Sequence, residues 1–305
     1  MANFRKQSLH LFRLAGIDVS LHWSWFLVAL YEISARSGSY SSPIWNAFEY
    51  LALFAIVTMH EFGHALACRQ TGGRADHIML WPLGGVAYVN PPPRPGATLW
   101  SIAAGPLVNV ALVPILFALS AWSRAQGWAL TMPNAYTLVQ SIVIINFVLL
   151  VFNLLPIYPL DGGQILRSLL WFGLGRARSL GAVAIIGFAG VAGLIGFAVW
   201  TKDFWLGLIA IFVLMSCWGG LQQARALSRF AKLPRRAEFA CPTCKSSPPL
   251  GAFWKCSQCQ TRYDSFLSQA VCPHCGAHEA MTQCADCGRS SPVSEWSAST
   301  LLSPG

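Results

Sequence analysis

Long apolar stretches separated by short polar connections fill the first two thirds of the chain. A helix needs roughly 20 apolar residues to cross a bilayer. Four stretches reach or approach this length: residues 45–68, 98–122, 137–157 and 180–200. Residues 204–221 form a fifth stretch, and residues 21–33 form a shorter one that His22 and Glu32 interrupt. The pattern therefore predicts six membrane-spanning helices, and the first has the weakest signal.

The composition agrees with this pattern. Of the 305 residues, 54% are hydrophobic and 11% are charged, and the mean hydropathy is +0.49. Soluble domains carry about 25% charged residues. The sequence therefore predicts an all-α polytopic membrane protein with a small polar appendage.

Basic residues are shared unequally between alternate loops. One set of loops holds fourteen Lys and Arg residues, and the other set holds only Arg36, Arg124 and Lys202. The positive-inside rule places the richer set, which includes both ends of the chain, in the cytoplasm. The net charge of +9 lies wholly in the membrane part. It is therefore a topology signal, and no nucleic-acid partner is expected.

The composition changes after residue 221. We expect a transmembrane domain over residues 1–221, a basic juxtamembrane linker over 222–240 suited to anionic lipid, a cysteine-rich domain over 241–296 and a disordered tail over 297–305. The cysteine-rich domain holds four CxxC pairs: Cys241/Cys244, Cys256/Cys259, Cys272/Cys275 and Cys284/Cys287.

Two CxxC pairs supply the four thiolates of a tetrahedral structural zinc site, so four pairs predict two sites in a double zinc-ribbon domain. A disulfide framework is the alternative, but cytoplasmic thiols stay reduced. Sequential pairing of the first two and the last two CxxC pairs is expected ahead of an interleaved cross-brace, and both orders stay open. We expect this domain to contact a cytoplasmic protein. An aromatic platform for nucleic acid is the other interpretation, although the domain is not basic.

His60, Glu61 and His64 form an H-E-x-x-H pattern inside the apolar stretch 45–68. In a helix, positions i and i+4 share a face, so both imidazoles can bind one metal ion. Glu61 is then placed to take a proton from water at the metal. Ionisable groups at membrane depth are costly, which favours a chemical role. A chance match in a core helix is the alternative.

A catalytic zinc ion needs a third protein ligand. Asp18, Glu32, Glu49 and Asp203 lie at the ends of predicted spans, where solvent exposure is expected. Asp161 differs, because two prolines interrupt the span before it and two glycines follow it. Broken helices at membrane depth are tolerated where they line a site. Asp161 is therefore the foremost candidate.

Three motifs resemble the site-2 protease family of intramembrane zinc metalloproteases: HEFGH at 60–64, AAGPLVN at 103–109 and NLLPIYPLDGG at 153–163. The PLGG at 82–85 is similar to that family's membrane-associated hairpin loop. The resemblance covers about residues 20–220. It implies that His60, His64 and Asp161 bind zinc, that Glu61 is the catalytic base, and that the protein lies in a bacterial inner membrane.

No segment has the length of an inserted PDZ domain, so the chain looks like the compact branch of that family. Members of this branch often carry a CBS module after the core, where this chain has its zinc knuckles. Asn109, Asn153, Gly84 and Gly85 are further candidates for substrate binding. Asn109 could instead hold the core spans together, and Asn153 could satisfy backbone groups freed by Pro156. Gly84 and Gly85 could form a turn, or an edge to which a peptide adds as a strand.

The expected function is hydrolysis of peptide bonds in or near transmembrane segments of membrane proteins, with one catalytic and two structural zinc ions. Two other classes stay open. One is a membrane zinc transporter or sensor, in which Glu61 would be dispensable. The other is a catalytically silent scaffold that recruits partners through its zinc-ribbon tail.

Overall fold

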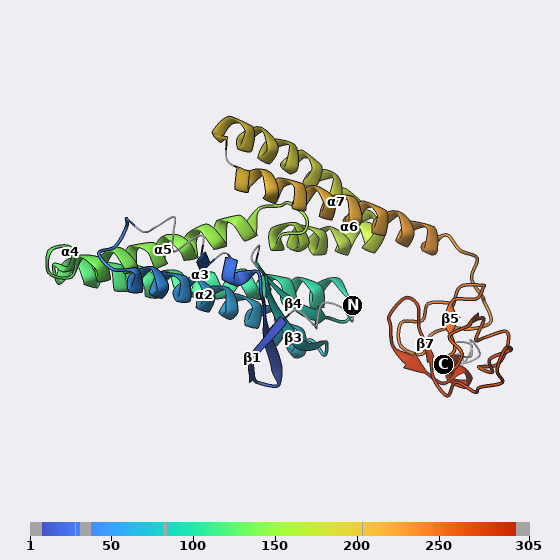
Figure 1. The fold of residues 1–305 in the computed structure, drawn as a ribbon. Helices are drawn as coiled ribbons and strands as arrows, with labels where there is room; N and C mark the ends of the chain where they lie inside the picture. Colours follow the sequence, from blue (N-terminus) through green and yellow to red (C-terminus); the bar gives the residue numbers. More distant parts are fainter. Residues whose placement is uncertain (1–7, 28, 31–37, 82–83, 203, 297–305) are drawn as a thin grey trace, which may run out of the picture. The chain divides into compact units, whose positions relative to one another are not determined.

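The computed structural model describes residues 8–27, 29–30, 38–81, 84–202 and 204–296. Five of the described helices are long and apolar enough to cross a membrane. They are α2 (Pro43–Gln70), α3 (Pro95–Ala125), α5 (Pro133–Leu154), α6 (Asp161–Thr201) and α7 (Phe204–Ala231). The short α4 (Trp128–Thr131) joins α3 to α5, and α2, α3 and α5 lie side by side (Figure 1). The chain is thus a mostly helical integral membrane protein, as predicted.

The number of spanning helices differs from the six predicted. Leu21 and His22, the first residues of the predicted span 21–33, end the strand β2 (Ile17–His22). They form a strand because Leu21 pairs with Leu80 of a neighbouring strand. The apolar residues around Leu21 in the sequence do not indicate this pairing. Residues 28 and 31–37 of the same segment lie outside the described part of the chain.

Described residues that precede α2 nevertheless contact it near both of its ends. Arg69, in the last turn of α2, donates hydrogen bonds to the carbonyls of Ala15 and Gly16 just before β2. Further along, the Tyr50 hydroxyl donates to the carbonyl of Trp25. Residue 40 lies beside the first turns of α2, as the next paragraph describes. These contacts lie near both ends of α2, which has 28 residues and is therefore about 42 Å long.

Glu49 is buried, although its place at the end of a predicted span suggested exposure. Only 6% of the residue is accessible, and its carboxylate accepts a hydrogen bond from the Tyr40 hydroxyl. The same hydroxyl lies 3.4 Å from Ser141 Oγ on α5. The carboxylate is therefore satisfied inside the helix packing.

Four strands form a sheet in the order β1–β2–β3–β4. β1 (Ser8–Leu14) pairs antiparallel with β2, and β2 runs parallel to β3 (Arg74–Trp81), with α2 as the crossover between them. β3 pairs antiparallel with β4 (Gly84–Asn90). This pairing confirms the hairpin that the resemblance implies, while residues 82–83 at its tip lie outside the described part. One core packs the sheet on α2: Ile17, Val19, Ile78 and Leu80 with Val57, Ala65 and Cys68.

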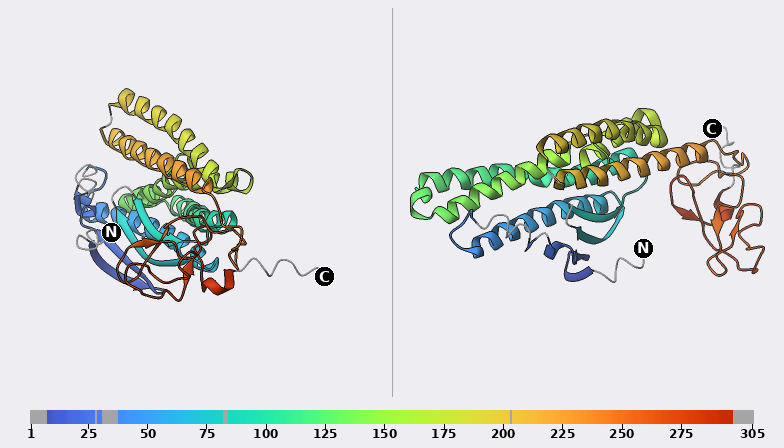
Figure 2. Two further views of the ribbon diagram at one scale, coloured as in Figure 1. Left: turned by 90° about the vertical axis from the view of Figure 1, so that its right-hand side faces the viewer. Right: turned by 45° about the horizontal axis from the view of Figure 1, so that its top comes forward.

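The predicted break in the chain lies between α5 and α6. α5 ends at Leu154, residues 155–160 form a loop with two prolines, and α6 begins at Asp161. α6 is itself kinked at Gly175, where φ is 78° and ψ is 168°. Beyond this kink α6 lies beside α7 (Figure 2), and their shared core includes Val191, Val213 and Cys217.

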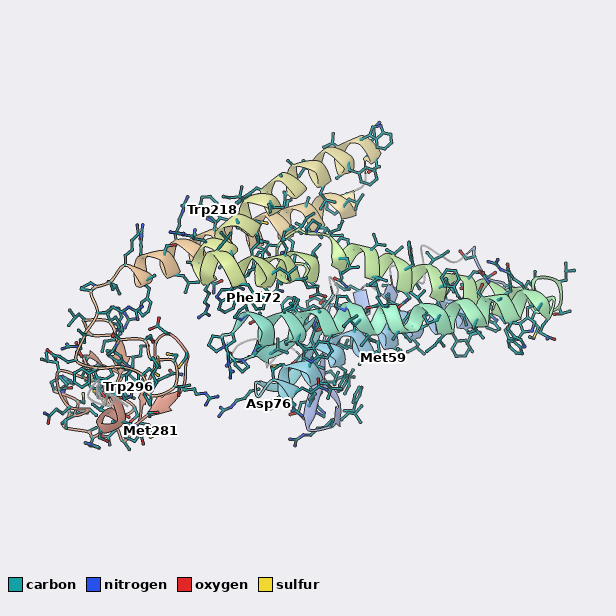
Figure 3. All side chains as sticks on the ribbon, turned by 180° about the vertical axis from the view of Figure 1, so that it is seen from behind. Met59, Asp76, Phe172, Trp218, Met281 and Trp296 are labelled. Atoms are coloured by element: carbon teal, nitrogen blue, oxygen red, sulfur yellow. The ribbon has the colours of Figure 1, made fainter. Side chains whose placement is uncertain are left out.

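The chain divides into two compact units, Met1–Arg225 and Ala226–Gly305. The second unit contains two small hairpins, β5 (Trp254–Lys255) with β6 (Arg262–Tyr263) and β7 (Thr282–Gln283) with β8 (Ser290–Ser291), followed by the 3-10 helix η2 (Val293–Trp296). Trp296 is buried at its centre, whereas Met281 lies at its surface (Figure 3). Aromatic residues fill this core: Trp254, Tyr263, Phe266 and Trp296.

Part of the predicted linker belongs to this second unit. Arg236 N–H donates to the Pro248 carbonyl, and Leu250 N–H donates to the Pro234 carbonyl. The Arg235 guanidinium makes two hydrogen bonds to the Asp286 carboxylate, at 2.5 and 3.1 Å. Two of the basic residues expected to face lipid are therefore used inside the folded unit. The predicted disordered tail, 297–305, lies outside the described residues.

Candidate metal centres

His60, His64 and Asp161 converge on one point although 101 positions separate the first from the last. Asp161 Oδ2 lies 3.0 Å from His60 Nε2 and 3.3 Å from His64 Nε2, and the two Nε2 atoms are 3.1 Å apart. Ligands bound to zinc at 2.0–2.1 Å in a tetrahedron are about 3.4 Å from one another. The three atoms therefore have the spacing of three zinc ligands, with a fourth direction left for water or substrate.

The second nitrogen of each imidazole fixes the orientation of its ring. His60 Nδ1–H donates to Asn109 Oδ1 at 2.6 Å, and His64 Nδ1–H donates to the Ser101 carbonyl at 2.9 Å. A carbonyl oxygen only accepts, so the proton of a neutral His64 stays on Nδ1 and the Nε2 lone pair faces the other ligands. Such outer hydrogen bonds orient metal-binding histidines and raise their basicity.

Glycines allow the close approach of the elements that carry the ligands. A methyl group added at Gly105 of α3 would lie 2.3 Å from His64 Nε2 and 2.8 Å from His60 Nε2. One added at Gly63 would lie 2.6 Å from the Ala104 carbonyl oxygen. Gly162 leaves equally little room, with the Leu154 carbonyl oxygen 2.2 Å from an added methyl. Small residues of this kind let membrane helices pack backbone to backbone.

Glu61 lies on α2 between the two histidines and is 5% exposed. Its Oε2 accepts a 2.8 Å hydrogen bond from the backbone N–H of Ala87 on β4. β4 is an edge strand of the described sheet, so this N–H points away from β3. The contact fixes one carboxylate oxygen of Glu61 and attaches the hairpin to the candidate centre.

The remaining predicted site residues lie at different places. Asn109 is fully buried, and its Nδ2 donates to Asn146 Oδ1 at 2.8 Å. Asn153 lies in the last turn of α5, and within the described part of the chain its side chain makes no hydrogen bond. Gly84 and Gly85 belong to β4, where they pair with Trp81 and Leu80 rather than forming a turn.

Sequence reasoning missed Asn146, Ser101 and Ala87, which hold the side chains at the centre. Asn146 is 1% exposed, and its Nδ2 donates back to the Asn109 carbonyl at 3.1 Å. A signal for Asn146 exists, because it is a polar residue in the middle of an apolar span. The other two act through their backbone groups, which carry no sequence signal.

The eight tail cysteines form two clusters of four, each with its sulfur atoms within 4.8 Å of one another. One cluster contains Cys241, Cys244, Cys284 and Cys287, and the other contains Cys256, Cys259, Cys272 and Cys275. The first CxxC pair thus joins the fourth, and the second joins the third. Sequential pairing is therefore wrong, and so is the interleaved order. The order is nested: the second and third pairs form the inner cluster, and the first and fourth pairs form the outer one.

The sulfur spacing fits zinc. Four Sγ–Sγ separations within the clusters are 3.7, 3.7, 3.5 and 3.6 Å. Sulfur atoms bound to zinc at 2.3 Å in a tetrahedron are about 3.8 Å apart, whereas a disulfide bond is about 2.05 Å long. All eight cysteines are free thiols. The clusters are thus suited to one tetrahedral ion each.

All four knuckles share one backbone design. The fourth residue after the first cysteine of each pair has a positive φ: Lys245 (61°), Gln260 (59°), Gly276 (74°) and Gly288 (72°). The N–H of that residue donates to the carbonyl of the first cysteine in each case. The turn brings the two sulfur atoms of each pair into the same cluster.

A mostly buried ion pair joins the segment before the first CxxC pair to the segment between the second and third pairs. Arg236 donates to Asp264 Oδ2 at 2.6 Å, and their side chains are 14% and 10% exposed. Burial raises the pKa of the Asp264 carboxyl, but Arg236 and the backbone N–H groups of Leu267 and Gly251 outweigh it. The pKa of Asp264 is therefore held below its ordinary value, and the carboxylate stays charged.

Comparisons with known proteins agree with this geometry. The model of peptidase family M50 matches residues 48–137 and 125–197. A zinc metalloprotease of Methanocaldococcus jannaschii is 32% identical over 222 residues, which is 72% of this chain and 61% of that protein. Stage IV sporulation protein FB of Bacillus subtilis is 33% identical over 120 residues, 38% of each chain. The chain therefore spans about three fifths of the first relative's length and less of the second.

A solved structure has a similar fold. The site-2 protease from Methanocaldococcus jannaschii superposes with a TM-score of 0.51 at 29% sequence identity. The similar region covers 70% of this chain and 95% of that one.

Proposed function

Since the chain belongs to peptidase family M50, we propose that it is an intramembrane zinc metalloendopeptidase. Its substrates are membrane proteins, which it cuts in or near their transmembrane segments. The observation that carries the proposal is the convergence of His60, His64 and Asp161 from two spanning helices, beside Glu61. A transporter or a scaffold would not need a carboxylate held at this place.

Zinc bound by His60, His64 and Asp161 would supply a Lewis acid that polarises the scissile carbonyl and makes water more acidic. Glu61 acts as the base: it takes a proton from the attacking water and delivers it to the leaving amine. Ala87 N–H occupies Glu61 Oε2, which leaves Oε1 as the proton acceptor. The low accessibility of all these side chains excludes bulk water from the reaction.

The free edge of β4 is suited to bind the substrate as an added strand. Backbone groups two residues apart on a strand point to the same side. Since Ala87 N–H faces Glu61, Gly85 presents its N–H and C=O to the same open edge, and Gly84 faces β3. A substrate unwound along this edge would have its backbone next to Glu61. Asn153, whose amide makes no hydrogen bond to the described residues, is a further donor for the substrate backbone.

The topology argument favours cytoplasmic termini in a bacterial inner membrane. We infer one crossing before α2 in addition to the five helices, so the N-terminal strands and the end of α7 share one side; the contacts of Ala15, Gly16 and Trp25 along α2 support this crossing. The fourteen basic residues of the richer loops fall on that side, which the positive-inside rule assigns to the cytoplasm. Cytoplasmic thiols stay reduced, in keeping with two structural zinc ions in the tail. The tail contacts a cytoplasmic protein.

A Glu61→Gln variant tests the proposal directly. It should keep three zinc ions per chain, one catalytic and two structural, and lose cleavage of a model transmembrane substrate. His60→Ala, His64→Ala and Asp161→Ala should keep only the two structural ions and be equally inactive. Cleavage by Glu61→Gln near the parental rate would overturn the assignment of the base, and three zinc ions in Asp161→Ala would overturn the ligand set.

A further inference from the structure

Residues 155–160, which lead into Asp161, are seated in a socket that α6 and α7 form. Ile157 and Tyr158 pack, together with Phe188 and Ile209, against the buried cluster of Val191, Val213 and Cys217. The Cys217 thiol donates to the Tyr158 carbonyl at 3.0 Å. The loop therefore meets a surface from the far part of α6 and from α7, neither of which supplies a zinc ligand.

Three glycines shape this socket. A methyl group added at Gly187 would lie 2.5 Å from Cys217 Sγ, and one at Gly190 would lie 2.6 Å from two side-chain carbons of Ile157. A methyl at Gly220 would lie 3.0 and 3.2 Å from ring carbons of Tyr158. Real Cβ atoms essentially never come closer than 3.0 Å to another heavy atom, so a methyl at Gly187 or Gly190 would displace Cys217 or Ile157. A methyl at Gly220 would require the Tyr158 ring to move by a few tenths of an ångström.

The other side of the loop is packed just as closely against the start of α6. A methyl at Gly163 would lie 2.6 Å from the Ile157 carbonyl group and from Tyr158 N. Leu160 N–H donates to the Ile157 carbonyl at 2.8 Å, and Leu160 directly precedes Asp161. A displacement of Ile157 and Tyr158 is therefore passed to the carboxylate ligand through one hydrogen bond and one residue.

We propose that this socket, formed by Gly187, Gly190, Cys217 and Gly220, positions Asp161 and thereby sets the zinc affinity of the membrane site. The inference rests on the proposed function. Zinc ligands must hold their distances within about 0.2 Å, and residues 155–160 lack a regular helix or strand that would fix them. The alternative is that Asp161 is positioned by the packing of α6 on α3.

Matched glycines test the socket. Gly220→Ala and Gly190→Ala fill it, while Gly219→Ala and Gly193→Ala change neighbouring positions of the same helices that have nothing within 4 Å. All four gain the same helix propensity, so the pairs differ only in the contact with the loop. Zinc affinity is measured on the full-length protein in detergent by competition with a chelator, and the two tail ions serve as an internal reference.

The socket variants should bind the third zinc ion about tenfold to hundredfold more weakly than their controls. This is the loss that follows when residues supporting a metal ligand are changed. Their zinc-free forms should unfold at the same temperature as the zinc-free controls, which separates positioning of Asp161 from general stability. Equal zinc affinity in Gly220→Ala, Gly190→Ala and the controls would overturn the inference. It would show that packing on α3 suffices.

Cys217 provides a second test that does not depend on added volume. Cys217→Ser keeps a donor for the Tyr158 carbonyl and should bind zinc nearly as the parent does. Cys217→Ala removes the donor and should bind it more weakly; equal affinity in both would contradict the role of this bond. If the parent protein binds only the two tail ions, the proposed function is wrong. If the parent binds a third ion whose affinity none of these substitutions changes, only the role of the socket is wrong.

Discussion

Replacing Asn109 by alanine separates two roles that the sequence leaves open, substrate binding and support of the core. The change removes the acceptor of His60 Nδ1–H, 2.6 Å away, and the donor to Asn146 Oδ1, 2.8 Å away. Asn109 is 0% exposed, so water does not readily replace either contact. His60 would then turn its ring or move its proton to Nε2, and either change takes the lone pair away from the metal.

The magnitude follows from the lost hydrogen bond. A buried N–H without an acceptor costs about 1–3 kcal/mol. At about 1.4 kcal/mol for each factor of ten, zinc should bind about 5-fold to 150-fold more weakly. Asn109→Asp is the matched control, because it keeps an oxygen acceptor for His60 and should restore most of the affinity.

Zinc competition combined with cleavage kinetics decides between the roles. If Asn109 orients His60, Asn109→Ala lowers zinc affinity and kcat, while KM stays near the parental value at saturating zinc. If it binds substrate, KM rises and zinc affinity does not change. Parental zinc affinity together with a raised KM would therefore refute the reasoning from the buried network.

Three further outcomes are expected. Gly105→Ala should release the catalytic zinc and reduce cleavage about 100-fold, since a methyl 2.3 Å from His64 Nε2 forces a displacement of about 1 Å. Gly96→Ala on the same helix, whose added methyl would have its nearest neighbour at 3.9 Å, should keep zinc and activity. Equal zinc contents in the two variants would contradict the packing argument. Asp264→Asn should destabilise the tail by about 3 kcal/mol at pH 7, because Arg236 stays buried without its partner. As the folded pKa of Asp264 is lowered, the difference in unfolding free energy between parent and variant should be constant above about pH 4 and shrink as the pH falls below it; a difference that grows on acidification would speak against the pair. Reporter fusions after Arg236 should be active only as cytoplasmic reporters and a fusion at Gly38 only as an external one, and the reverse pattern would invalidate the topology.

The chemistry of the membrane site could be predicted from the sequence because helix geometry is local. His60 and His64 share a helix face at a spacing that any α-helix provides, and the apolar length of their span places them at membrane depth. Asp161 was identifiable from the prolines and glycines around it, which mark a broken helix. The cysteine spacing likewise indicated structural zinc before any tertiary contact was known.

Only the tertiary structure decided how these pieces are supported. The strand at Leu21 depends on pairing with β3, which lies more than fifty residues away and beyond α2, so apolar length alone suggested a helix. The nested order of the CxxC pairs depends on the tertiary packing of the domain, because each pair has the same local spacing in every order. Ala87 and Ser101 act through backbone groups that every residue possesses. The sequence determined which side chains can bind zinc; the fold determined which hydrogen bonds and glycine contacts hold them at the distances that zinc requires.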